Sequence, residues 1–153
     1  MVLGSVRFIA LVLTALALVP SGAHLLELPG KIGLSQDDYF VVQEIYRGWA
    51  LFGFVLVGAI TATFVLAVLL YGSRTPFVLA CAAFLLITTT LAVFYLGAFP
   101  ANQATGNWTV VPDNWRALRS QWEFGHATAA VLTFVAFCAL VLEAVGPRRP
   151  AAR

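Results

Sequence analysis

Residues 49 to 99 read WALFGFVLVGAITATFVLAVLLYGSRTPFVLACAAFLLITTTLAVFYLGAF, and this stretch decides the fold. It contains two long apolar runs, and Arg74, in the short turn between them, is its only charged residue. Each run reaches the roughly 20 apolar residues that an α-helix needs to cross about 30 Å of hydrocarbon. Lipid cannot hydrogen-bond to open backbone groups, so both runs must be helices.

Two further apolar runs lie on either side, near residues 8–28 and 122–142, which makes four candidate membrane spans. The sequence therefore predicts an all-α, integral membrane four-helix bundle, a single domain over residues 1–153 with helices at about 6–28, 36–71, 76–99 and 113–143. The composition agrees, because the chain is 61% hydrophobic and only 10% charged, whereas soluble domains average about 25% charged residues. A net charge of +2 is too small for a nucleic-acid-binding protein. Cys81 and Cys138 lie inside apolar runs and indicate neither a disulfide framework nor a thiolate metal site.

The distribution of basic residues predicts the topology. With four spans, both termini and the turn at 72–76 share one side, while two longer loops share the other. The first side has a small excess of basic residues, namely Arg7, Arg74, Arg148, Arg149 and Arg153, against Lys31, Arg47, Arg116 and Arg119 on the second. We expect the first side to be cytoplasmic, which gives an N-in, C-in protein. The expected location, the bacterial inner membrane, is a separate hypothesis.

Proline and capping residues predict the helix ends. Pro29-Gly30 should stop the first helix, and Pro100 should end the third. Ser35 with Asp38 three residues later is a capping pattern that starts the second helix, and Pro112-Asp113 opens the fourth. One alternative for the first run is a signal peptide cleaved after Ser21-Gly22-Ala23, although apolar residues continue past that point.

Polar side chains gather in the half of the bundle that we call outer. Two patterns there repeat in opposite order: HLLE at 24–27 in the first helix and EFGH at 123–126 in the fourth. Residues three apart share a helical face. Because the first helix runs outward and the fourth inward, both patterns place a histidine beneath a carboxylate. If the two faces meet, His24, Glu27, Glu123 and His126 converge.

This set of side chains predicts a functional site, since ionisable residues inside a membrane are costly. As metal ligands, His24, Glu27, Glu123 and His126, with Glu44 as a third carboxylate, would suit non-haem iron or copper. A metal ion shared by the histidines requires their rings to lie within about 10 Å of each other. A haem held by His24 and His126 is an alternative, as is an acid–base site without a metal. Glu27 with Lys31, and Glu123 with Arg119, could instead be simple pairs on helix surfaces.

Several motifs together resemble a known family. They are AHLLELPGK at 23–31, VQEIYRGW at 42–49, PAN at 100–102 and WRALRSQWEFGH at 115–126. The chain is similar over nearly its whole length to the anthrone oxygenase-like family of small four-helix membrane proteins. The resemblance implies oxidation of an anthrone methylene to a quinone with molecular oxygen. It brings no settled cofactor or catalytic set, and Ala127 to Ala129 replace an arginine expected after the last histidine.

From these observations we expect an oxygen-dependent oxidoreductase acting on a hydrophobic, aromatic substrate. His24, His126 and Tyr46 are the predicted catalytic residues. Substrate-binding residues are predicted among Trp49, Trp115, Trp122, Asn102 and Arg119, although tryptophans at this level are also typical of the membrane interface. The alternative is a non-catalytic or haem-binding subunit of a larger membrane complex, or a homo-oligomer. Transport is disfavoured, because no charge or broken helix is predicted at mid-membrane.

Overall fold

The computed structural model describes residues 1–146, and every regular element in that range is helical. Four stretches are long and apolar enough to cross a membrane: Val2–Lys31, Trp49–Leu69, Arg74–Ala104 and Trp115–Val145. The all-α prediction is confirmed, and the chain is an integral membrane protein. The arginines at 148, 149 and 153, on which the predicted topology partly rests, lie outside the described residues, and the N-in, C-in orientation stays a prediction.

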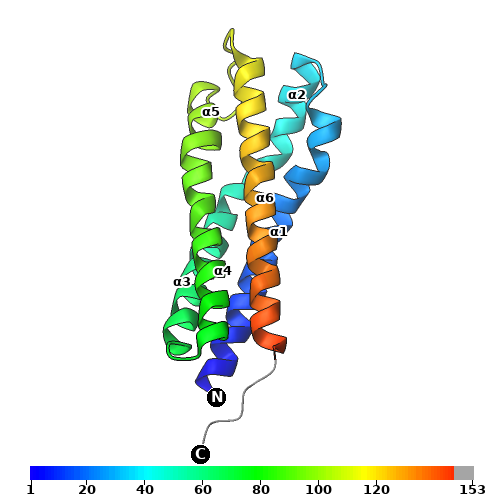
Figure 1. Ribbon diagram of the computed structural model, residues 1–153. Coiled ribbons are helices and arrows are strands. Elements are labelled where there is room, and N and C mark those ends of the chain that lie inside the picture. The colour runs from blue at the N-terminus through cyan, green and yellow to red at the C-terminus, as the bar shows by residue number, and fades with distance from the viewer. Residues whose placement is uncertain (147–153) are drawn as a thin grey trace, which may run out of the picture.

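The four spans form a bundle in which each packs against two neighbours. α1 (Val2–Lys31) lies between α3 (Phe52–Leu69) and α6 (Trp115–Val145), and α4 (Arg74–Val93) closes the bundle between α3 and α6. The N-terminus, the α3–α4 turn and the end of α6 lie at one end, called inner here (Figure 1). α2 (Gln36–Gln43), α5 (Phe99–Ala104) and the start of α6 lie at the other, outer end (Figure 1).

Small side chains let the helices approach closely in the inner half. The buried residues there include Ala10, Ala59, Ala80 and Ala136, with Leu66, Ile87 and Leu140 filling the space between them. Such alanine-rich contacts are typical of helices packed in lipid, where close van der Waals contact drives association. Buried threonines donate to carbonyls of their own helices, as Thr63 does to Ala59 O at 2.8 Å. The two cysteines are free.

An ion pair joins the first and last helices near the inner end. Arg7 Nε donates to Glu143 Oε2 at 2.8 Å and Arg7 Nη2 donates to Glu143 Oε1 at 2.6 Å. The Glu143 side chain is fully buried. Two parallel N–H···O bonds are the strongest geometry that an arginine and a carboxylate can adopt, so this pair fixes how α1 and α6 cross.

The first and second predicted helices differ from the structure. α1 runs on to Lys31 although Pro29 was expected to stop it at 28. A proline removes only one helical hydrogen bond, and the bond from Ile32 N to Leu28 O, 3.0 Å long, completes another turn. The predicted helix 36–71 is broken, since α2 is followed by the 3₁₀ turns Glu44–Tyr46 (η1) and Trp49–Leu51 (η2). Gly48, between them, has a φ of 92°, a left-handed conformation that glycine tolerates.

The third and fourth predicted helices differ as well. Pro100 does not end the third, because the five-residue π-helix Phe94–Ala98 (η3) precedes it and leads directly into α5. Pro100 thereby falls in the first turn of a helix, where a missing N–H costs nothing. α6 begins at Trp115 rather than 113. The Ser35 cap is confirmed, with Asp38 N donating to Ser35 Oγ at 3.3 Å.

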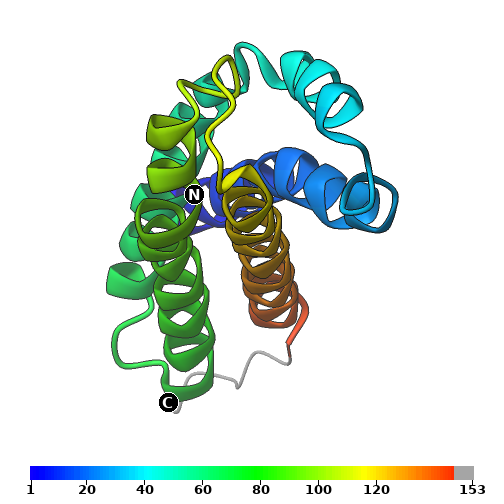
Figure 2. The ribbon, with the colours of Figure 1, turned by 90° about the horizontal axis from the view of Figure 1, so that it is seen from above.

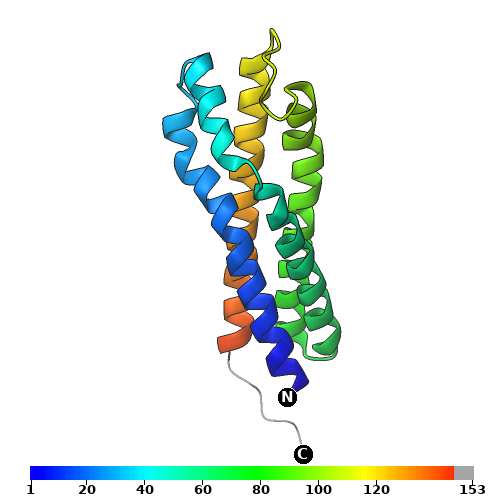
Figure 3. The same cartoon turned by 180° about the vertical axis from the view of Figure 1, so that it is seen from behind.

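α2 lies beside the bundle rather than in it. Seen from above, the chain leaves α1, passes through α2 and returns to α3 around the outer end of the bundle (Figure 2). From behind, α1 crosses the bundle obliquely and η1 descends from α2 towards α3 (Figure 3). Large aromatic side chains bridge α2 and the start of α6, among them Tyr39, Phe40, Trp108 and Trp115. This arrangement covers the outer end with side chains from three segments.

Candidate functional site

Two imidazole rings lie side by side in the outer half of the bundle. His24 comes from α1 and His126 from α6, and their ring centroids are 4.4 Å apart. This distance is well inside the roughly 10 Å within which two rings can share one metal ion. Only 5% of His24 is exposed, because α1 and α6 are neighbours along their length and both histidines face that seam.

Aromatic side chains surround the pair. Trp122, one turn before His126 on α6, lies 4.3 Å from the His126 ring and 4.9 Å from the His24 ring. Tyr46 and Trp49, on either side of the break at Gly48, lie 4.5 Å and 5.4 Å from the His24 ring. The break in the predicted second helix therefore supplies one wall of the site. Non-helical backbone at membrane depth is tolerated where it is packed against protein or lines a site.

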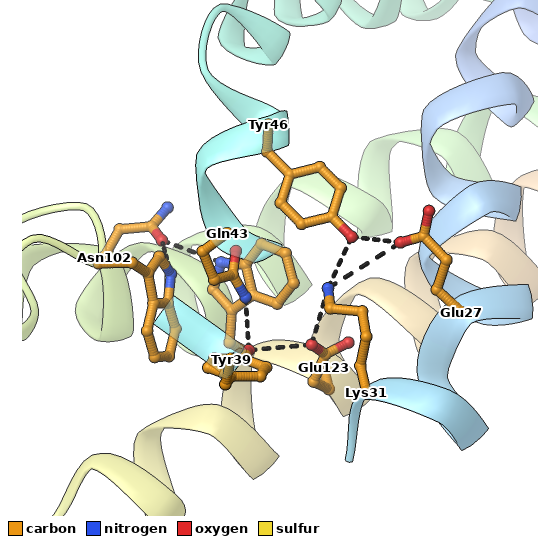
Figure 4. Close-up of polar contacts among 9 residues, drawn as sticks. Glu27, Lys31, Tyr39, Gln43, Tyr46, Asn102 and Glu123 are labelled. Atoms are coloured by element: carbon orange, nitrogen blue, oxygen red, sulfur yellow. Dashed lines mark hydrogen bonds and ion pairs between the residues drawn. The ribbon is translucent and has the colours of Figure 1, made fainter. Parts of the chain in front are cut away.

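A buried lysine joins the two carboxylates of the site (Figure 4). Lys31 Nζ lies 2.9 Å from Glu123 Oε1 and donates to the hydroxyl of Tyr46 at 2.7 Å. Tyr46 in turn donates to Glu27, whose carboxylate is 4.0 Å from the same ammonium. The Glu123 side chain is fully buried and that of Lys31 is 6% exposed. A charge taken out of water must be paired in this way or become neutral.

The chain of hydrogen bonds continues into α2. Tyr39 donates to Glu123 Oε1 at 2.9 Å, and Gln43 Nε2 donates to the Tyr39 hydroxyl at 2.5 Å (Figure 4). Burial raises the pKa of the Tyr39 phenol, and the nearby Glu123 carboxylate raises it further. Burial likewise raises the pKa of Tyr46, with its hydrogen bond to Glu27 as the second cause. Both phenols are therefore donors throughout the physiological pH range.

Two buried polar atoms of the site have no hydrogen-bond partner within residues 1–146. They are His24 Nδ1 and Glu123 Oε2. A buried polar group normally has a partner, so a molecule bound in the site could hydrogen-bond to either atom. The site thus combines a nitrogen that can take a proton, an ammonium that can stabilise negative charge, and apolar walls.

The other residues predicted for the site lie further from the histidines. Arg119 Nη1 donates to Leu34 O at 2.8 Å, and the guanidinium lies over the rings of Trp115 and Tyr39. Asn102 contacts two indoles, those of Trp108 and Trp122. Both belong to the aromatic packing beneath the outer surface.

Glu44 does not lie in this site. It is exposed on η1 and faces Arg47 at 4.0 Å. The tryptophans also differ from an interfacial belt, because Trp108, Trp115 and Trp122 are buried inside the outer end.

Sequence reasoning missed the central role of Lys31 and Tyr39. Lys31 follows His24 by seven residues and Glu27 by four, so all three share one face of α1, and this spacing was the available sign. The apparent partner at four residues, Glu27, concealed the closer partner on α6. Tyr39 carried no such sign, because α2 reaches the site only through the fold.

The side chains present fit a metal ion poorly. Among the described residues, no group of three or more His, Cys, Asp or Glu side chains is placed to share one, whereas non-haem iron sites use two histidines and a carboxylate. Lys31 and Tyr39 already bind Glu123 Oε1. The imidazoles also cannot flank a haem iron as they stand, because two bonds of about 2 Å on opposite sides would separate the ring centres by more than the 4.4 Å seen. Iron or copper at His24, Glu27, Glu123 and His126 stays a prediction.

Comparison with protein-family models, with curated proteins and with solved structures finds no match to this chain.

Proposed function

We propose that the protein is a membrane-embedded oxidoreductase that oxidises a hydrophobic, aromatic carbon acid with molecular oxygen at the outer end of the bundle. The observation that carries the proposal is the imidazole pair, 4.4 Å apart within aromatic walls and next to the buried ammonium of Lys31. A substrate of the anthrone type, suggested by the sequence resemblance, has a flat ring system, a ketone and an acidic methylene. Each of these features has a chemical counterpart in the site.

The first step is removal of a methylene proton by an imidazole. His24 Nδ1 is buried and has no partner among residues 1–146, and a positioned base of this kind contributes about 10²- to 10⁴-fold to a rate. His126, in contact with the His24 ring, can share the positive charge that forms. The fully buried Glu123 carboxylate, one turn away on α6, also stabilises that charge.

The second requirement is stabilisation of the enolate that proton removal creates. Lys31 supplies a cation, and its ammonium donates to the Tyr46 hydroxyl. Donors fixed before the reaction stabilise developing negative charge without reorganising, which is a large term in many enzymes. The substrate ketone would take the place of one of the present partners of Lys31.

The third step is reaction with oxygen. The carbanion and O₂ give a hydroperoxide at the former methylene carbon, and loss of water leaves the second carbonyl. The balance is one anthrone and one O₂ to one quinone and one water, and the proton taken by the base returns in the water. Oxygen and the substrate are both more soluble in the bilayer than in water. An apolar molecule would enter the site beside Tyr46 and Trp49, because both side chains are only half-buried.

The test is oxygen uptake by the full-length protein in lipid nanodiscs with anthrone as substrate, together with quinone formation followed by absorbance. We expect one O₂ consumed per quinone, and His24→Gln or His126→Gln to lower kcat by about 10²- to 10⁴-fold. Asp37→Asn, on the exposed face of α2, is the matched control and should keep the full rate. Wild-type protein no faster than empty nanodiscs would overturn the function, and full activity in both histidine variants would overturn the site.

A further inference from the structure

Asn102 holds two tryptophan side chains with a single oxygen atom. Its Oδ1 accepts from Trp122 Nε1 at 2.9 Å and from Trp108 Nε1 at 3.1 Å (Figure 4). An amide oxygen has two lone pairs, so both bonds can form at once. Asn102 itself lies on α5, and it reaches the histidines through Trp122.

The backbone that delivers Trp108 is held in an unfavourable conformation. Gly106, Asn107 and Trp108 have φ values of 55°, 56° and 67°, three left-handed residues in succession. A bulky residue rarely adopts this conformation unless its surroundings impose it. Thr105 does so here, because its Oγ1 accepts from Trp108 N at 3.0 Å and its carbonyl accepts from Thr109 N and Val110 N at 2.9 Å. The outcome is a buried Trp108 whose ring lies 5.1 Å from Tyr39 and 5.9 Å from Trp122.

Trp122 is the part of this assembly that touches the site. Its ring contacts His126 and His24 at 4.3 Å and 4.9 Å, and Lys31 Nζ lies 4.8 Å from its centroid. An indole without a bond at its N–H can turn about its side-chain torsions. A fixed N–H therefore fixes the plane that packs against both imidazoles and the ammonium.

We infer that Asn102 is a positioning residue: through its shared oxygen it fixes the Trp122 indole against the His24–His126 pair. Trp108, bound to the same oxygen, packs against Trp122 and supports that orientation. The inference rests on the proposed function only for its catalytic consequence. It revises the expectation from sequence, in which Asn102 bound the substrate directly.

The decisive variants are Asn102→Leu, which removes the acceptor at similar size, and Asn102→Asp, which keeps oxygens able to accept both N–H groups. Gln103→Leu, the exposed neighbour, is the matched control. In nanodiscs containing ¹⁵N-tryptophan-labelled protein, we expect Asn102→Leu to shift two of the four indole N–H signals, those of Trp108 and Trp122. Asn102→Asp should leave both near the hydrogen-bonded range, and Gln103→Leu should shift none. Unshifted signals in Asn102→Leu would overturn the inference.

Kinetics separate positioning from substrate binding. In the anthrone assay we expect Asn102→Leu to lower kcat by at least about tenfold with KM changed less than about twofold, since a small misplacement near reacting groups is costly. Asn102→Asp should recover most of the rate. A raised KM with unchanged kcat would overturn the inference and support direct substrate contact. A wild-type protein without oxygen uptake would contradict the proposed function alone, and the indole signals would still decide the positioning.

Discussion

Replacing Lys31 with methionine should destabilise the protein by about 3–5 kcal/mol, the usual cost of removing one partner of a buried ion pair. Methionine keeps an unbranched apolar stem, one atom shorter than that of lysine, and it leaves the Glu123 carboxylate buried without its cation. Tyr39 would still donate to Glu123. One hydrogen bond from a neutral phenol does not replace an ammonium 2.9 Å away.

The magnitude follows from the geometry. At an effective dielectric constant of about 20, two unit charges 2.9 Å apart attract by about 6 kcal/mol. In the wild type, desolvation of both charges offsets much of this gain. In the variant the desolvation of Glu123 remains and the attraction is lost, so most of the attraction appears as lost stability.

The assay is equilibrium unfolding in mixed micelles, followed by circular dichroism. The matched control is Arg47→Met, which breaks the exposed pair of Arg47 and Glu44 at 4.0 Å and should cost no more than about 1 kcal/mol. The double variant Lys31→Met/Glu123→Gln removes both charges and keeps an acceptor for Tyr39, so it should return to within about 2 kcal/mol of wild type. A loss below about 1 kcal/mol in Lys31→Met, or no recovery in the double variant, would show that the buried ion pair does not stabilise the fold as its geometry indicates.

Three further predictions test other parts of the structure. The pKa values of Tyr39 and Tyr46 are raised, so neither phenol should ionise in the folded protein up to about pH 11, whereas unfolded tyrosine ionises near pH 10. Tyr39→Phe/Tyr46→Phe should therefore leave unchanged the increase in tyrosinate absorbance measured in a titration up to that pH. Their contribution to stability is therefore fully present below about pH 10 and is lost as the pH rises above it, and a smaller step in the double variant would contradict the assigned burial. Gly48→Ala should lower the free energy of unfolding by about 1 kcal/mol or more because the φ of Gly48 is 92°. Gly53→Ala on α3, where an added Cβ meets no other atom, should be neutral or stabilising. Equal effects of the two changes would count against the left-handed conformation at 48. Arg7→Met leaves the buried Glu143 carboxylate without its cation and should lower the free energy of unfolding by about 3 kcal/mol in the same assay. An unchanged unfolding midpoint would show that the pair is dispensable.

The spans could be predicted from sequence because lipid leaves little choice. Long apolar runs must be helices there, and their length and order determine a four-helix bundle. The irregular segments could not be predicted in the same way. Pro29 and Pro100 predict helix ends locally, and neither helix ends there. α1 continues to Lys31, and α4 continues through the π-helix into α5. The second span shows the reverse, since a helix expected to be continuous from 36 to 71 is interrupted by two 3₁₀ turns on either side of Gly48.

The candidate site was predictable only as far as helix periodicity reaches. The mirrored spacing of histidine and glutamate gave the two faces, and chain direction placed them at one depth. The partner of each charge depended on side-chain packing between helices. Lys31 prefers the fully buried Glu123 to the half-exposed Glu27 on its own helix, because the carboxylate without water needs the cation more.

Hydrogen–deuterium exchange at the substrate methylene, measured without oxygen, shows whether the histidine pair acts as the base. Anthrone in D₂O buffer is mixed with the protein in nanodiscs under argon, and deuterium uptake is followed by mass spectrometry. We expect exchange at least about 10²-fold faster than with the His24→Gln/His126→Gln variant, because the histidines remove the proton before oxygen reacts. Exchange no faster than with that variant would contradict the assignment of the histidine pair as the base.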